Sequence, residues 1–109
     1  MIIDFNKIEE QSIPNFKGGE KSLEARMYFD GTNRVLKGRL QPGASIGLHT
    51  HDDSCEMIFL TRGTATVIYD GERITLHEGQ CHYCPKGHSH TLINESDEEI
   101  HITAVVPQQ

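Results

Sequence analysis

Three histidines and one glutamate have the residue types and the spacing of a metal-binding set. His49 and His51 are two positions apart, so on an extended strand both imidazoles lie on one face. Glu56 follows beyond a short polar loop, which must reset the alternation if its carboxylate is to face the same way. A later turn is expected to bring His90 back beside this pair. Three neutral imidazoles and one carboxylate suit one divalent transition metal: Mn, Fe, Co, Ni, Cu or Zn.

The elements that position these residues are predicted to be strands. Apolar and polar residues alternate over Ser22–Phe29, and Asp30-Gly31 is a tight-turn signal that leads into a second strand at residues 34–40. Further strands are predicted at residues 55–60, 64–69, 73–76, 80–84, 90–93 and 100–106. The one helix candidate is the short segment at residues 5–11. Many short strands separated by turn signals predict an all-β sandwich or barrel.

Two glycine-framed segments carry a resemblance to a known family. Residues 43–63 read Gly43-x5-His49-x-His51-x4-Glu56-x6-Gly63, and residues 79–94 read Gly79-x5-Pro85-x-Gly87-x2-His90-x3-Asn94. These segments resemble the two motifs of the cupin superfamily, and the whole chain, residues 1–109, resembles a small single-domain cupin of the conserved-barrel, RmlC-like kind. The resemblance implies a jelly-roll barrel, also called a double-stranded β-helix. It also implies that the three histidines and the glutamate are the metal ligands.

The framing residues have structural roles of their own. Gly43, Gly63, Gly79 and Gly87 fall at predicted turns, where a left-handed backbone favours glycine. Pro85 is suited to start the turn that presents the second motif's histidine.

Some of the same residues also fit simpler interpretations. His49 and His51 taken alone fit a pair of exposed strand histidines beside an acidic turn. Cys81 and Cys84, with the histidines that follow them, superficially resemble a zinc cluster. Residues three apart on a strand point to opposite faces, so the two thiols are not expected to share an ion.

Catalytic residues are not identified by the sequence. Tyr83, His82, His101 and Arg39 are candidates to line the cavity as an acid, a base or a support for the ligands. The pattern does not fix which of them faces inward, because strand register is uncertain after two turns.

The composition of the chain limits the classes of partner and the location that are expected. Sixteen acidic and ten basic residues give a net charge of −6, which argues against nucleic acid. No apolar run is long enough to span a membrane, and the start of the chain has no signal-peptide pattern, so a cytoplasmic protein is expected. Cys55, Cys81 and Cys84 are then expected to be reduced. The apolar start, residues 1–3 with Phe5, is suited to pair with a second copy, and we expect a homodimer.

Two functions follow as hypotheses. The first is a small metal-dependent enzyme of the dioxygenase, decarboxylase, isomerase or lyase type, acting on a small polar, carboxylate or carbonyl compound. The second is a non-enzymatic module that binds or senses a small ligand or a metal. An inward-facing acid or base beside the ligands would favour the enzyme.

Overall fold

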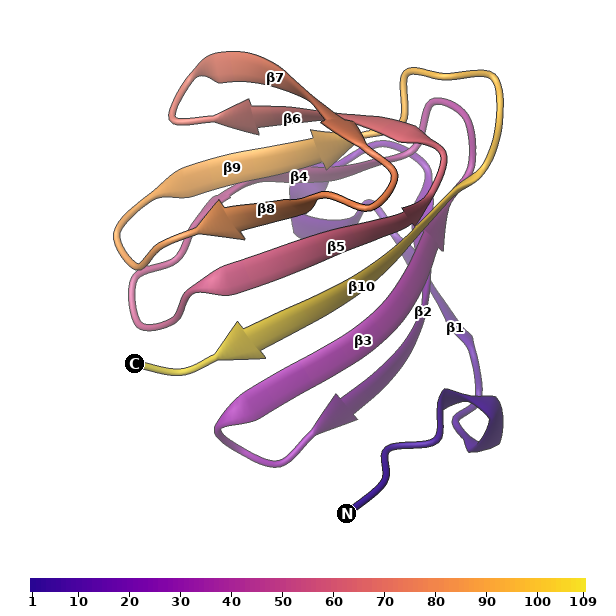
Figure 1. Cartoon of the computed structure of the whole chain (residues 1–109), viewed down its shortest axis with the longest axis vertical. Coiled ribbons are helices and arrows are strands. Elements are labelled where there is room, and N and C mark those ends of the chain that lie inside the picture. The colour runs from indigo at the N-terminus through magenta and orange to yellow at the C-terminus, as the bar shows by residue number, and fades with distance from the viewer.

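The computed structural model describes residues 1–109 and forms two antiparallel sheets that face each other (Figure 1). In spatial order, the six-stranded sheet contains β1 (Gln11–Pro14), β2 (Ser22–Phe29), β3 (Asn33–Leu40), β10 (Ile100–Pro107), β5 (Glu56–Arg62) and β8 (Cys81–Cys84). The four-stranded sheet contains β4 (Ser45–Thr50), β9 (Ser89–Ile93), β6 (Thr64–Tyr69) and β7 (Glu72–His77). The predicted all-β class is confirmed, and the arrangement is that of a double-stranded β-helix barrel. No helix in it is long and apolar enough to cross a bilayer.

The helix candidate at residues 5–11 forms only a single turn. Only Phe5–Lys7 is helical, as the 3-10 turn η1, and Gln11 already begins β1. The Asp4 carboxylate accepts a hydrogen bond from the Asn6 backbone N–H at the start of η1. The chain then returns to an extended conformation and pairs with β2, so sheet pairing overrides a weak local helix tendency. A second 3-10 turn, η2 (Phe16–Gly18), was not predicted.

The core lies between the two sheets and follows the period-two pattern of the sequence. Inward-facing residues alternate with half-buried or exposed ones along β2, β3 and β10. The most deeply buried apolar side chains are Leu23, Leu40, Ile58, Leu60, Val67, Leu92, Ile100 and Ile102. Because both sheets contribute to this cluster, burial of apolar surface holds the two layers together.

The turn glycines adopt the conformation that the sequence predicts. Gly43, Gly63, Gly79 and Gly87 have φ values of 84°, 93°, 88° and 89°, all in the left-handed region. At Gly63 space is restricted as well, since an added Cβ would lie 2.9 Å from a methyl carbon of Ile100.

A bulge in β4 turns the metal-site residues inward. The register between β4 and β9 shifts between Ile46 and His49, so both of these side chains face the interior although they are three residues apart. Leu48 is 68% exposed on the outside. Gly47 lies against η2, where an added Cβ would be 2.1 Å from the Lys17 carbonyl oxygen. The bulge therefore places η2 beside His49, and Lys17 of η2 and His49 line the same cavity.

Candidate metal centre

The structure brings the four predicted metal ligands together from three strands and one loop. His49 is in β4, His51 directly follows β4, Glu56 begins β5 and His90 is in β9. His49 and His90 are opposite each other across the β4–β9 ladder. The four ligand atoms all lie within 4.8 Å of one another.

The histidine nitrogens that converge are all Nε2 atoms. His90 Nε2 lies 3.0 Å from His51 Nε2 and 3.1 Å from His49 Nε2. The Glu56 Oε1 atom is 2.9 Å from His90 Nε2, 3.2 Å from His51 Nε2 and 3.8 Å from His49 Nε2. In a cluster of neutral imidazoles, such short N–N distances direct several lone pairs at one point, which a cation at that point would satisfy.

The opposite nitrogen of each ring has its own partner. His49 Nδ1–H donates to the Gly47 carbonyl oxygen at 2.8 Å. His51 Nδ1 is 2.9 Å from Ser54 Oγ, and His90 Nδ1 is 3.0 Å from a nitrogen of a further histidine, described below. Such partners orient a ring and leave Nε2 free to act as a ligand.

Glu56 is held in its ionised form. Burial alone would raise the pKa of this carboxyl, but the surrounding imidazoles of His49, His51 and His90 outweigh that effect and hold the pKa well below its usual range. The side chain is almost completely buried, with the residue 8% exposed. A buried carboxylate that stays charged is the form that a divalent ion needs as a ligand.

These atoms fit a first-row divalent ion. On an octahedral ion with bonds of about 2.1 Å, adjacent donor atoms lie about 3.0 Å apart. The observed separations of 2.9–3.2 Å match adjacent positions, and the 3.8 Å separation between His49 and Glu56 is the widest of those measured. Four protein ligands would leave two positions of such an ion for a small molecule.

Of the four candidate acid–base residues, only His82 lies at this cluster. It is buried in β8, and its Nε2 is the atom 3.0 Å from His90 Nδ1. Burial, with a smaller contribution from the nearby His90, lowers the pKa of His82 to about 4, so the ring is neutral at pH 7. Tyr83, the next residue along β8, is 52% exposed and points to the outside, as strand alternation requires.

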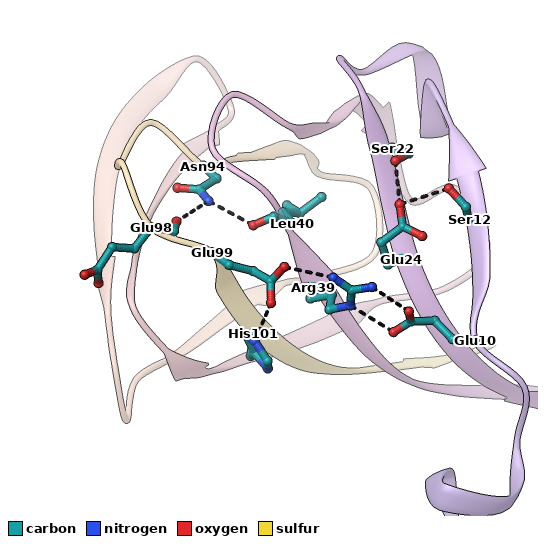
Figure 2. A network of polar contacts seen from close by, with 10 residues as sticks. All are labelled: Glu10, Ser12, Ser22, Glu24, Arg39, Leu40, Asn94, Glu98, Glu99 and His101. Atoms are coloured by element: carbon teal, nitrogen blue, oxygen red, sulfur yellow. Dashed lines mark hydrogen bonds and ion pairs between the residues drawn. The ribbon is translucent and has the colours of Figure 1, made fainter.

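Arg39 and His101 are also on the outside, which corrects their candidacy. The Arg39 guanidinium binds both carboxylate oxygens of Glu10, at 2.7 and 3.0 Å, and one oxygen of Glu99, at 2.9 Å (Figure 2). His101 Nε2 is 2.9 Å from the other Glu99 oxygen. This network ties the segment before β1 to β3 and β10, so both residues have a structural role away from the metal cluster.

The zinc-cluster alternative is not supported in its original form. Cys81 is exposed and Cys84 is buried, so the two thiols face opposite sides of β8. Cys84 does lie with His82 and His90 in a second group whose ligand atoms are within 4.8 Å. Burial raises the pKa of the Cys84 thiol to about 11, whereas metals bind the thiolate. The three-histidine, one-glutamate cluster is therefore the better metal site.

A cavity of about 410 Å³ adjoins the cluster, and His49, His51 and Glu56 form part of its lining. Lys17 and Arg34 also line the cavity, and neither was predicted from the sequence as a site residue. The alternation along β3 could have identified Arg34, because it lies two residues from the inward-facing Leu36 and therefore on the same face. Nothing in the local pattern of η2 indicated that Lys17 reaches the cavity.

The fold and the cluster together define a small barrel protein with a histidine-rich cluster that could hold a metal ion. Residues 36–106 match the Cupin domain family. The chain therefore belongs to the cupin family.

One relative found by its sequence and two solved structures are similar to this chain. An oxalate-binding protein of Thermotoga maritima is 24% identical over 112 residues, which cover 97% of this chain and 93% of the relative. A crystal structure from the same organism, described as a predicted oxalate decarboxylase, has a TM-score of 0.92 and 23% identity over the whole of both chains. A sugar phosphate isomerase of the cupin superfamily from Silicibacter pomeroyi has a TM-score of 0.80 and 20% identity, covering all of this chain and 76% of that one.

Proposed function

We propose that this chain is a metal-dependent enzyme that acts on a small molecule bearing a carboxylate or carbonyl group. The observation that carries the proposal is the convergence of three Nε2 atoms and one carboxylate oxygen beside a 410 Å³ cavity, which His49, His51 and Glu56 help to line. In this proposal His49, His51, Glu56 and His90 hold one divalent transition metal, of the Mn, Fe, Co, Ni, Cu or Zn group.

The bound metal would supply a Lewis acid that polarises the oxygen of a coordinated substrate. The chain's own residues do the rest. The apolar part of the cavity lining excludes water from the substrate, and the orienting partners of the histidines keep the ligand atoms in place. Asp52 and Asp53 also line the cavity, and their exposed carboxylates are the proton acceptors there that are not ligands.

Among the reaction types, decarboxylation has the most support. One solved structure that is similar over the whole of both chains is described as a predicted oxalate decarboxylase. Loss of carbon dioxide from a carboxylate needs an electron-withdrawing centre beside the bond that breaks, and a metal at this cluster would provide one. The isomerase relative has the same fold, so the fold alone does not select the reaction.

A non-enzymatic binding module is the second candidate. The relative from Thermotoga maritima is named an oxalate-binding protein. In addition, the cavity lining contains no histidine or tyrosine besides His49 and His51. A binding role would need the same metal and cavity but no proton transfer.

We also propose a homodimer. Met1 and Ile2 are 96% and 90% exposed, and a second copy would remove them from water. Sedimentation at micromolar concentration tests this, and a monomer would refute it.

The first experiment is elemental analysis of untagged protein, compared with the variants His51→Ala and His77→Ala. His77 is an exposed histidine of β7, so its variant controls for loss of a histidine away from the cluster. Near-stoichiometric metal in wild type and His77→Ala, but not in His51→Ala, supports the site. The loaded protein is then incubated with oxalate and other small carboxylic acids, and NMR follows their conversion. Consumption of an acid supports the enzyme, whereas binding without conversion supports the module.

A further inference from the structure

Arg34 occupies an inward position of the barrel. It lies two residues before Leu36, on the face of β3 that the core residues share, and it lines the cavity. Across the sheet it is opposite Phe29 on one side and Val106 on the other. Arg34 is half-buried, so its guanidinium lies at the rim of the cavity, in line with the core-facing residues of the strand.

This guanidinium has no carboxylate partner. Its Nη1 atom is 3.5 Å from the Met27 sulfur, and its Cζ atom is 4.5 Å from the centre of the Phe29 ring. No acidic oxygen lies within ion-pair distance of it, whereas Arg39 pairs with Glu10 and Glu99, and Arg73 pairs with Glu95. Packing on Phe29 therefore holds the side chain at the cavity and leaves its hydrogen-bond fork free.

The register of the sheet gives the separation between Arg34 and the metal cluster. Met57 is opposite Val105, and the Cys55 N–H donates to the Pro107 carbonyl, so Glu56 falls opposite Val106. Arg34 is opposite Val106 from the other side. The backbones of Arg34 and Glu56 are thus two strand spacings apart, about 10 Å.

The surface between these two groups is apolar. Met27, Leu36, Ile46, Ile102 and Val106 line the same cavity. Oxalate consists of two carboxylates and has no hydrocarbon to place against these side chains. A longer acid would bury hydrocarbon there, worth about 0.8 kcal/mol for each CH₂ group.

We propose that the cavity takes an elongated organic acid, with a polar end at the metal, an apolar middle against Leu36, Ile102 and Val106, and a carboxylate held by Arg34. Lys17 is a second cation of the lining without an acidic partner, although the same lining also contains the carboxylates of Asp52 and Asp53. This inference rests on the proposed function for the metal end of the ligand, and assigns Arg34 as the residue that selects the other end.

The test uses metal-loaded protein and a series of linear dicarboxylates: oxalate, succinate, adipate and suberate. Metal content is measured first, and calorimetry then gives the dissociation constant for each acid. We expect adipate or suberate to bind at least about tenfold more tightly than oxalate. In Arg34→Met we expect the affinity for the long acids to fall by about tenfold, as for loss of a charged hydrogen bond. The affinity for oxalate should change less than about twofold.

Two variants serve as controls. Arg34→Lys keeps the charge but loses the fork, and we expect intermediate affinity for the long acids. Lys37→Met removes a cation from the outer face of the same strand, and we expect wild-type affinity. All three variants should retain metal and melt within a few degrees of wild type.

The outcomes separate this inference from the proposed function. Metal-loaded protein that binds oxalate as tightly as the long acids, or binds none of them, overturns the elongated-acid inference and leaves the metal site intact. Long-acid affinity that is the same in Arg34→Met as in wild type also overturns it. Failure to take up metal refutes the proposed function instead. Arg34-dependent binding of suberate to metal-free protein would then still support the role of Arg34.

Discussion

His82 Nε2 lies 3.0 Å from His90 Nδ1, on the side of the His90 ring that faces away from the other three ligand atoms. For His90 Nε2 to offer a lone pair, its proton must reside on Nδ1, and a neutral His82 accepts that proton in a hydrogen bond. The low pKa of His82, about 4, keeps it neutral over the physiological range. A neutral His82 with an unprotonated Nε2 is therefore the acceptor that would stabilise the His90 form with a free Nε2 lone pair.

Replacing His82 tests this relationship. In His82→Phe the acceptor is lost, and we expect metal affinity to fall by about 10- to 100-fold. In His82→Gln the amide oxygen can accept the same hydrogen bond, so most of the affinity should return. Competition with a chromophoric chelator measures both variants, and equal affinities in His82→Phe and wild type would contradict the assignment.

The three cysteines should differ sharply in reactivity. Cys81 is exposed, whereas Cys55 and Cys84 are buried, and burial raises the pKa of the Cys84 thiol to about 11. Because the thiolate is the reactive form, native protein treated with iodoacetamide at pH 8 should gain one label, at Cys81. Intact mass before and after unfolding measures this. Cys81→Ser should gain none in the native state, and rapid labelling of Cys84 would show that the barrel opens readily at β8.

The ion pair between Arg39 and Glu10 should contribute to stability in a pH-dependent way. The hydrogen bond from Arg39 lowers the pKa of Glu10 below its ordinary value of 4.5. A depressed carboxyl pKa stabilises the fold above the ordinary value, and this contribution is lost as the pH falls through the lower, folded-state value. The two side chains are 33% and 28% exposed, so screening limits the effect to about 1 kcal/mol at pH 7.

Urea unfolding of Glu10→Gln measures that contribution. The free energy of unfolding should be about 1 kcal/mol lower than in wild type at pH 7, and the difference should shrink once the pH is well below 4.5. Glu9→Gln, at an exposed neighbouring position, is the control and should match wild type at both pH values. A difference that persists unchanged at low pH would point to packing rather than charge.

Gly47 should be intolerant of any side chain. An added Cβ would lie 2.1 Å from the Lys17 carbonyl oxygen, which is backbone and cannot swing away. We expect Gly47→Ala to destabilise the protein by at least about 2 kcal/mol and to displace η2 from the cavity. At Gly31 an added Cβ meets nothing within 4 Å, although φ is 97°, so Gly31→Ala should show the smaller effect of backbone strain alone, about 1 kcal/mol. Thermal unfolding compares the two.

The strand pattern was predictable where alternation and turn residues point to the same bounds, whereas β4 was not among the predicted strands. Ser22–Phe29 and Thr64–Tyr69 have the predicted bounds because alternation and Asp-Gly turn chemistry agree there. The bulge between Ile46 and His49 was not predictable, because it depends on the approach of η2 from elsewhere in the chain. The sequence also did not distinguish His82 from Tyr83, because a shift of one residue in the strand register decides which of them faces inward.

The ligand positions also have a consequence for how the barrel moves. His49 and His90 belong to the four-stranded sheet, whereas Glu56 begins a strand of the six-stranded sheet. An ion held by these residues would fasten one layer to the other through the single Glu56 carboxylate. The layers could then separate near this point only by breaking that bond. Loading the site would therefore slow hydrogen exchange at the start of β5 and at its partners in β8 and β10 far more than at the β1–β2 pair, which lies beyond β3 in the same sheet.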